Sequence, residues 1–551
     1  MKSNRRQPME ASLSKHLLYK GCVMKKSVNM AKLRTNMILT RVGVSAAALM
    51  LAGCTLAPNY ERPQSPVSGA WPDMRIGVPP EDQQGLIASD LSWQQFFGDE
   101  RLKRLIEVAL ENNRDMRVAI LNIERARAQY QVQRSDLLPS VGASGSINRQ
   151  TTGSGGRSVL TDSAGNVIYN PLSESAQNAS SYNTYQAAIG ITSYELDLFG
   201  RVRSLSAAAL SNYLSTVETR KATQISLIAS VATGYYTLLA DDELLKLTEE
   251  TLKTREESLQ LTQLKFDHGV SSELDVRQAE TLVESARSTL AQLRRQRAQD
   301  ENAFMLLIGG PLPADLPQGV SFAQQMTSLP ELRAGVPSDV LVRRPDILAA
   351  EQQLVAANAN IGAARAAFFP SISLTASLGK ASGDLDNLFS SGHVWTFMPQ
   401  ITLPIFTGGR NIANLEVANV DRDIAVAQYE KAIQSAFRDV SDALAGRATY
   451  DDQLTAMRAL VMATQKTYQL SDLRYRNGVS SYMDLLDSQR ALFDAQQQEI
   501  TAQLAMLNNQ ITLYKVLGGG WSQQDEERMS EEMNNAGRSS SDGDQQSAQT
   551  N

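Results

Sequence analysis

Apolar residues recur at helical spacing over long stretches of the chain that contain no proline. One such stretch runs from 172 to 310 and the other from 405 to 551. Proline interrupts helices, and apolar residues three or four positions apart share one helix face. The pattern therefore predicts long amphipathic helices in both stretches, as in the run Leu227, Ile228, Val231, Tyr235, Leu238 and Leu239.

The helices expected in the first half are long. We place them at roughly 201–267 and 272–308, with a shorter helix near 107–136. With a rise of about 1.5 Å per residue, they measure about 100, 55 and 45 Å. The two shorter helices stacked end to end match the long one. Each half of the chain can therefore form a rod that is two helices wide.

Strict alternation of apolar and small polar residues marks the candidate strands. It is clearest over 371–379, where Ile372 and Leu374 alternate with serines and Thr375. A period of two puts the apolar side chains on one face of a strand. Lengths of about 9 to 11 residues suit tilted strands that span a bilayer. We expect two strand pairs, 138–148 with 185–197 and 371–379 with 395–405.

Four strands from one chain cannot close a barrel with an open interior. A sheet edge cannot be left unpaired in lipid, so other copies of the chain must complete the sheet. Two copies would give about eight strands, whose side chains fill the interior, whereas three copies give about twelve and leave a lumen. The polar segments 151–183 and 380–394 have the composition of outer loops. A soluble sandwich remains the alternative for these strands.

The sequence repeats itself in two ungapped matches. Residues 261–280 resemble 470–489, and residues 114–147 resemble 345–378. Each half thus reads as helix, strand, polar loop, strand, very long helix, turn and shorter helix. We expect an α+β fold with these parts: a signal peptide at 1–53, a lipidated extended and equatorial segment at 54–106, the first repeat at 107–310, an equatorial connection at 311–344, the second repeat at 345–521 and a disordered tail at 522–551.

The N-terminus has the features of a secretory signal. Basic residues precede a short apolar run that ends at Cys54, and this run is too short to span a bilayer. The sequence from Leu51 to Cys54 resembles a bacterial lipobox, which implies acylation of the cysteine, and the following Thr55 implies sorting to the outer membrane. Cys22 is the only other cysteine and lies in the leader. The mature chain can therefore form no disulfide framework.

Charge and composition argue against several classes of function. Ten of the 53 basic residues precede Cys54, but only one of the 59 acidic residues does. The rest of the chain therefore carries a net charge of −15, which argues against binding to nucleic acid. With only three histidines, His16, His268 and His393, we expect neither a metal site nor a histidine-based catalytic site. The segment 343–346 (RRPD) lacks the Lys-Ser/Thr of a phosphate loop. We expect no enzymatic activity and no cofactor apart from the lipid on Cys54.

Several long motifs resemble those of the outer membrane factor (TolC-like) family, in its OprM-type lipoprotein branch. They are LAGC at 51, PNYERPQSP at 58, ALENNRD at 109, YELDLFGR at 194, VPSDVLVRRPDI at 336, IGAARAAFFPSISLTASLG at 361, LPIFTGG at 403, QYEKAIQ at 428 and LGGGW at 517. The resemblance implies a homotrimer with a 12-stranded β-barrel in the outer membrane and a helical tunnel across the periplasm.

In this family the channel is the passive exit duct of a tripartite pump. The resemblance implies two partners: a periplasmic adaptor (membrane fusion protein) and an inner-membrane resistance-nodulation-division transporter. It implies multidrug efflux from a Gram-negative cell. A duct for type I protein secretion is the alternative, and a lipid-anchored helical scaffold without a pore is the third hypothesis.

Both predicted helical hairpins turn at a glycine. Glycine suits the left-handed conformation that ends a helix, and Ser272 and Ser481 can cap the next helix with the Asp three residues later. Efficient turning alone would explain these residues. The resemblance implies in addition that the tips dock the adaptor, through Gly269, Val270, Ser271, Gly478, Val479 and Ser480.

The second tip carries charges that the first tip lacks. Asp487 and Arg490 fall on Gln278 and Thr281 in the repeat. In a trimer, Asp487 would form a ring that attracts cations, and Met483, one helical turn away, could form an apolar constriction. A solvated helix face is the simpler interpretation. The resemblance implies that these residues belong to a periplasmic gate, consisting of Met483, Asp487, Arg490 and Arg474.

Overall fold

The computed structural model describes most of the chain after the lipobox. The predicted signal peptide, Cys54, much of the segment 151–183 and the tail 522–551 lie outside the described residues. The described residues are 55–69, 71, 86–152, 160–161, 167–168, 180–325, 329–333, 343–390 and 392–521.

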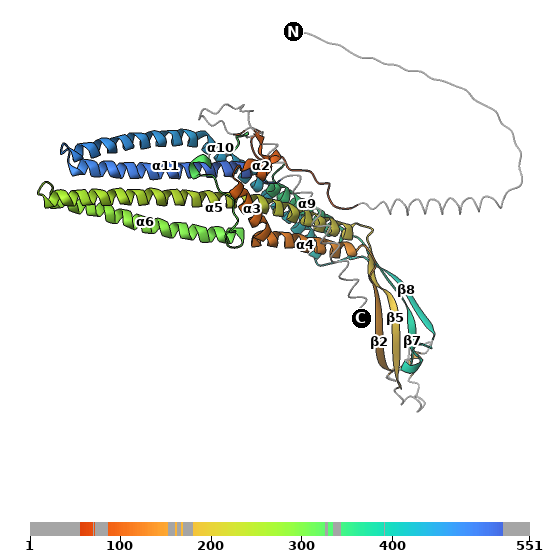
Figure 1. Ribbon diagram of the computed structural model, residues 1–551. Helices are drawn as coiled ribbons and strands as arrows, with labels where there is room; N and C mark the ends of the chain where they lie inside the picture. Colours follow the sequence, from red (N-terminus) through yellow and green to blue (C-terminus); the bar gives the residue numbers. More distant parts are fainter. Residues whose placement is uncertain are drawn as a thin grey trace, which may run out of the picture. The chain divides into compact units, whose positions relative to one another are not determined.

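Two long helical hairpins dominate the structure (Figure 1). The first consists of α5 (Arg201–Asp267) and α6 (Glu273–Ile308), as the proline-free pattern predicts. The second consists of α10 (Arg410–Arg476) and α11 (Tyr482–Val516). Both long helices contain 67 residues, and each starts after a glycine with positive φ. None of the described helices combines the length and the hydrophobicity that a bilayer crossing requires.

The single helix predicted at 107–136 is wrong, because the chain forms two helices there. They are α3 (Glu100–Asn112) and α4 (Arg114–Ser135), separated by Asn113 in an extended conformation. The Asn113 side chain accepts a hydrogen bond from the Met116 amide at 2.9 Å and donates one to the Leu307 carbonyl at 2.8 Å. Asparagine is a favourable N-cap, so the break starts α4 and ties it to α6.

A four-stranded antiparallel sheet joins both halves of the chain. Its strands are β2 (Val141–Thr152), β5 (Ser180–Leu196), β7 (Ser371–Ser382) and β8 (His393–Thr402). The order is β2-β5-β7-β8, so the two predicted strand pairs meet through β5 and β7. In the described part of the chain, β2 and β8 therefore form the two edges of this sheet.

The strand register aligns the alternating residues on common faces. Leu378 lies opposite both Trp395 and Ile189, and Ile372 lies opposite Ile401, so apolar side chains share one face. Ser371, Ser373, Thr375 and Ser377 of β7 lie on the other face, together with Val394 and Met398 of β8. The apolar residues are largely exposed in the isolated chain, with Trp395 72% accessible. The predicted alternation of an apolar and a polar face is therefore confirmed for β7.

The bounds of all four strands differ from the sequence prediction by one to five residues. β5 spans 180–196 rather than 185–197, and β7 ends at 382 rather than 379. β2 spans 141–152 rather than 138–148, and β8 spans 393–402 rather than 395–405. Pro139 and Pro404 flank the start of β2 and the end of β8 and cannot donate a ladder hydrogen bond. Pro399 lies inside β8, which is compatible with the edge position of this strand.

The remaining elements are shorter than the long helices of the hairpins. The helix α9 (Pro345–Ala366) packs against α5 and α10. A buried cluster beside α5 contains Phe96 and Tyr514, whose rings stack at 3.9 Å. The other elements are β1 (Leu86–Ile87), η1 (Ala88–Asp90), α2 (Trp93–Phe96), β3 (Leu160–Thr161), β4 (Val167–Ile168), α7 (Phe322–Gln325), β6 (Leu332–Arg333) and η3 (Leu385–Asn387).

Candidate functional site

The two hairpin tips are built in the same way. Gly269 and Gly478 both have φ of 73°, and an added Cβ would meet nothing within 4 Å at either position. Glycine is therefore required for its backbone conformation rather than for space. The Val270 amide donates to the Lys265 carbonyl at 2.8 Å, and the Val479 amide makes the equivalent bond at 2.9 Å. These bonds close the long helices in the manner of a Schellman motif.

Capping boxes start the return helices. The Ser272 side chain accepts from the Asp275 amide, and the Asp275 side chain accepts from the Ser272 amide. Ser481 and Asp484 form the same pair at the second tip. The predicted caps are confirmed, and they hold each tip in one defined conformation.

The tips expose apolar side chains. Val270 is 74% accessible and Val479 is 67% accessible. Leu274 and Met483, on the first turns of α6 and α11, are also exposed. Exposed apolar residues that cluster on a rigid turn are a common feature of docking surfaces.

Three of the four predicted gate residues share one face of α11. Met483, Asp487 and Arg490 follow at helical spacing and are exposed. The Arg490 guanidinium lies 4.0 Å from the Asp487 carboxylate, so the expected pair forms but is loose. Arg474 is also exposed, near the end of α10, and among the described residues no hydrogen bond or ion pair joins its side chain to the other three.

A buried arginine behind this face was not anticipated from the sequence. Arg255 of α5 is 5% accessible, and its guanidinium lies 5.1 Å from the centre of the Phe493 ring. It donates to the Leu282 carbonyl at 3.1 Å. Burial, and then the charge of Arg490, lowers the pKa of this guanidinium, although Asp494 acts in the opposite direction. Its position three residues after Leu252, within an apolar stripe, was the available signal.

The two hairpins also contact each other near their tips. The Lys265 ammonium lies 3.7 Å from the centre of the Tyr475 ring and donates to the Tyr475 carbonyl at 3.3 Å. Thr262 and Tyr475 place their hydroxyls 3.4 Å apart. Tyr482 packs edge-on against Tyr475 at 5.4 Å. Tyr475 therefore links α5, α10 and α11, and no local sequence pattern indicated this role.

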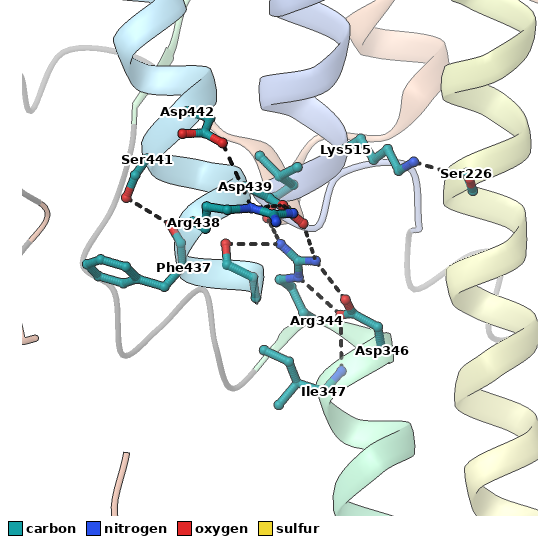
Figure 2. A network of polar contacts seen from close by, with 12 residues as sticks. Ser226, Arg344, Asp346, Ile347, Phe437, Arg438, Asp439, Ser441, Asp442 and Lys515 are labelled. Atoms are coloured by element: carbon teal, nitrogen blue, oxygen red, sulfur yellow. Dashed lines mark hydrogen bonds and ion pairs between the residues drawn. The ribbon is translucent and has the colours of Figure 1, made fainter. Parts of the chain in front are cut away.

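The RRPD segment has a structural role at the opposite end of the second hairpin (Figure 2). Arg344 is buried and donates to the Val516 carbonyl at 3.1 Å and the Ala436 carbonyl at 3.5 Å. It also pairs with both carboxylate oxygens of Asp346, at 3.1 and 2.6 Å. Asp439 lies 3.9 Å away. One guanidinium thus joins the start of α9 to α10 and to the end of α11.

The apolar residues of the tips, the charged residues of α11 and the buried arginines are suited to docking, to attracting ions and to packing, respectively. In the described part of the chain, no group of three or more His, Cys, Asp or Glu side chains is placed to bind a metal. Cys54 lies outside the described residues, so its acylation stays a prediction.

Comparisons with known proteins cover nearly the whole described chain. The family model for the outer membrane efflux protein matches residues 105–310 and 336–519. The probable efflux pump outer membrane protein TtgC of Pseudomonas putida is 48% identical over 486 residues, which are 88% of this chain and 96% of TtgC. The outer membrane protein OprJ of Pseudomonas aeruginosa is 42% identical over 486 residues, covering 87% and 96% of the two chains.

Solved structures agree with this assignment. The open state of the MtrE outer membrane channel of Neisseria gonorrhoeae aligns with a TM-score of 0.73 and 41% identity, over 85% of this chain and 99% of MtrE. A membrane protein from Pseudomonas aeruginosa aligns with a TM-score of 0.74 and 39% identity, over 85% and 98% of the two chains. The chain therefore belongs to the outer membrane efflux protein family, and it is an efflux channel of the Gram-negative outer membrane.

Proposed function

We propose that this protein is the passive exit duct of a tripartite multidrug efflux pump of the resistance-nodulation-division type. The proposal is carried by two features that occur together in one chain: a sheet with two open edges, and two long hairpins with exposed tips. Relatives named for antibiotic and toluene efflux favour this function over protein secretion. The duct itself needs neither catalysis nor a cofactor.

The open sheet edges support a homotrimer. In the described part of the chain, the outer edges of β2 and β8 have no neighbouring strand in this sheet. Lipid offers no hydrogen bonds to the exposed backbone, so β8 of one copy would pair with β2 of the next. Three copies would give a barrel of about twelve strands with an open lumen. The apolar face, which includes Trp395 and Ile401, would then contact lipid.

The helix lengths support a duplicated chain. α4 and α9 contain 22 residues each, and α5 and α10 contain 67 residues each. We infer an internal repeat whose halves are 107–310 and 345–521, joined by an equatorial connection at 311–344. The segment 54–106 would complete the equatorial region.

Thr55 is the first described residue and directly follows Cys54, and its contacts support a lipid anchor on Cys54. The Cα of Thr55 would lie 3.1 Å from a Cβ added to Gly200, and the hydroxyls of Thr55 and Ser204 lie 3.5 Å apart. Gly200 follows β5 closely and immediately precedes α5. The chain next to Cys54 is therefore fixed where the sheet meets the helices, which is a suitable level for an acyl anchor in the membrane.

The second tip would form the gate. Three copies of Asp487 and Arg490 would surround the axis, with Met483 as an apolar ring and Arg474 close to the turn. An exposed pair at this spacing contributes only about 0.2 to 0.5 kcal/mol. Several such weak contacts could hold the tip closed, and an adaptor that binds the apolar tips, including Val270 and Val479, could open it. The transporter of the inner membrane would supply the energy.

Conductance measurements test the duct and its gate. We would reconstitute the mature protein in planar bilayers and compare the wild type with Asp487→Ala combined with Arg490→Ala. Small, cation-selective currents that grow severalfold in the double variant are expected. Gln278→Ala combined with Thr281→Ala, at the repeat-related positions of the first tip, is the matched control and should leave conductance unchanged. Equal currents in all three proteins would contradict the gate, and a folded, inserted protein without currents would contradict the duct.

A further inference from the structure

A buried carboxyl group in the first hairpin has no obvious counter-charge. Asp241 of α5 is 8% accessible. Its Oδ2 atom is inaccessible to solvent and has no hydrogen-bond partner among the described residues. An ionised carboxylate that is buried without donors is strongly destabilising. The carboxyl must therefore be neutralised by something that needs almost no space.

The neighbouring donors are already engaged. Asp241 lies in hydrogen-bonding contact with Asp300 of α6. Gln296 donates to the Asp300 Oδ2 atom at 2.9 Å. Arg297 donates to Asp242 at 2.6 Å and to Glu301 at 2.5 Å. Two carboxyl groups thus meet between α5 and α6, and Arg297, the cation that acts on Asp241, is bonded to other carboxylates.

α11, α7 and α3 also pack against α5. α11 packs against α5 but has no charged residue between Glu499 and Lys515. α7 has no charged residue. α3 carries Arg101 and two internal ion pairs, Lys103 with Glu100 and Arg104 with Glu107. Asp99, which precedes α3, is buried and accepts a hydrogen bond from Tyr235, and Tyr235 lies about two turns before Asp241 on α5.

Burial and these neighbours shift the pKa of Asp241 strongly. Burial is the largest cause, followed by the hydrogen bond to Asp300 and its charge, and then the charge of Asp242. Arg297 opposes them, and the net effect raises the pKa of Asp241 from 3.8 to about 7. The group therefore changes its charge near neutral pH.

We propose that Asp241 and Asp300 form a proton-binding site that holds α5 against α6. The neutral carboxyl of Asp241 donates a hydrogen bond to the carboxylate of Asp300. When the proton leaves, the buried carboxylate of Asp241 and the half-buried carboxylate of Asp300 face each other and repel, so the contact between the helices weakens. The contact between α5 and α6 is therefore more stable at acidic pH than at alkaline pH. This pH dependence does not require the second tip to be the gate.

The direction of the pH dependence follows from proton linkage. The pKa of Asp241 is higher in the closed contact than in an opened segment, where the ordinary value of 3.8 applies. The stabilisation by the proton is complete below pH 3.8, declines as the pH rises, and is lost above about pH 7. Between pH 5.5 and 8 the opening equilibrium constant should rise about tenfold to thirtyfold.

Hydrogen exchange in the full-length protein in detergent tests this site. Exchange would be followed at peptides covering 236–247 and 295–303 and corrected for the intrinsic pH dependence of amide exchange. The wild type should show the tenfold to thirtyfold rise. Asp241→Asn keeps a donor towards Asp300 and should show a flat profile with greater protection at pH 8. Asp300→Asn, which offers a donor to Asp241, should also remove the rise.

An exposed carboxylate on the same helix provides the matched control. Glu249→Gln removes an exposed carboxylate of α5 that pairs with Arg294 of α6, and it should retain the pH-dependent rise. A rise that persists in both Asp241→Asn and Asp300→Asn, with the trimer intact by size-exclusion chromatography, would overturn the proposal. Protection of the wild type at pH 8 that is restored by millimolar Ca²⁺ or Mg²⁺ would also overturn it, because a metal ion would then replace the proton.

Discussion

Arg344→Ala should destabilise the junction of the second hairpin. The side chain of Arg344 is 10% accessible and forms a hydrogen bond of 3.1 Å with the carbonyl of Val516, the last residue of α11. A hydrogen bond from a charged donor contributes about 1.5 to 3 kcal/mol. The bond to Ala436, at 3.5 Å, adds little.

The ion pair with Asp346 contributes less than its geometry indicates. The Asp346 side chain is 45% accessible, so solvent screens the pair to at most about 1 kcal/mol. The sum is about 3 kcal/mol, which corresponds to a loss of protection of about 100-fold. Hydrogen exchange at the end of α11, over residues 505–517, measures this loss directly.

Arg438→Ala is the matched control for this prediction. Arg438 lies on α10 and pairs with Asp439 at 2.6 Å, but its side chain is 69% accessible. We expect a change within about 0.5 kcal/mol. Unchanged protection in Arg344→Ala, or an equally large loss in Arg438→Ala, would refute the reasoning from burial.

Three further predictions concern the turns and caps. Gly478→Ala places a Cβ at φ of 73° and should cost about 1 to 2 kcal/mol, measured as faster hydrogen exchange at the second tip. Asn113→Ala removes the cap of α4 and should lower the free energy of unfolding by about 1 kcal/mol or more, measured by denaturant unfolding. Burial alone would raise the pKa of Asp275, but hydrogen bonds from Ser271 and Ser272 outweigh it and lower the pKa. The stability that this carboxylate gives the first tip is therefore present above pH 3.8 and lost as the pH falls through the depressed pKa, and Ser271→Ala should shift that loss to higher pH in hydrogen exchange.

Much of the fold could be predicted from local sequence patterns. The bounds of α5 agree with the predicted 201–267, because proline-free apolar periodicity and a flanking glycine act over a few residues. The capping boxes at Ser272 and Ser481 were readable for the same reason. Alternation over 371–379 located β7 and its apolar face.

Part of the candidate site followed from the same patterns. The spacing of Met483, Asp487 and Arg490 predicted a shared face of α11, and the structure places them there. The sequence did not indicate how Arg474 lies relative to this face. The roles of all four residues as a gate remain a prediction, because a gate requires neighbouring copies of the chain.

Only the tertiary structure decided which distant residues meet. The sequence by itself determined the helices, turns and strands, because propensity, periodicity and capping act between residues close in the chain. Arg344 and Val516 are 172 positions apart, and their contact depends on how α9, α10 and α11 pack. The same holds for the pairing of β5 with β7 and for the burial of Asp241 beside Asp300. From the sequence alone, a charged residue on a helix is predicted to face solvent. Whether it is buried or paired depends on how the chain packs and not on the residue itself.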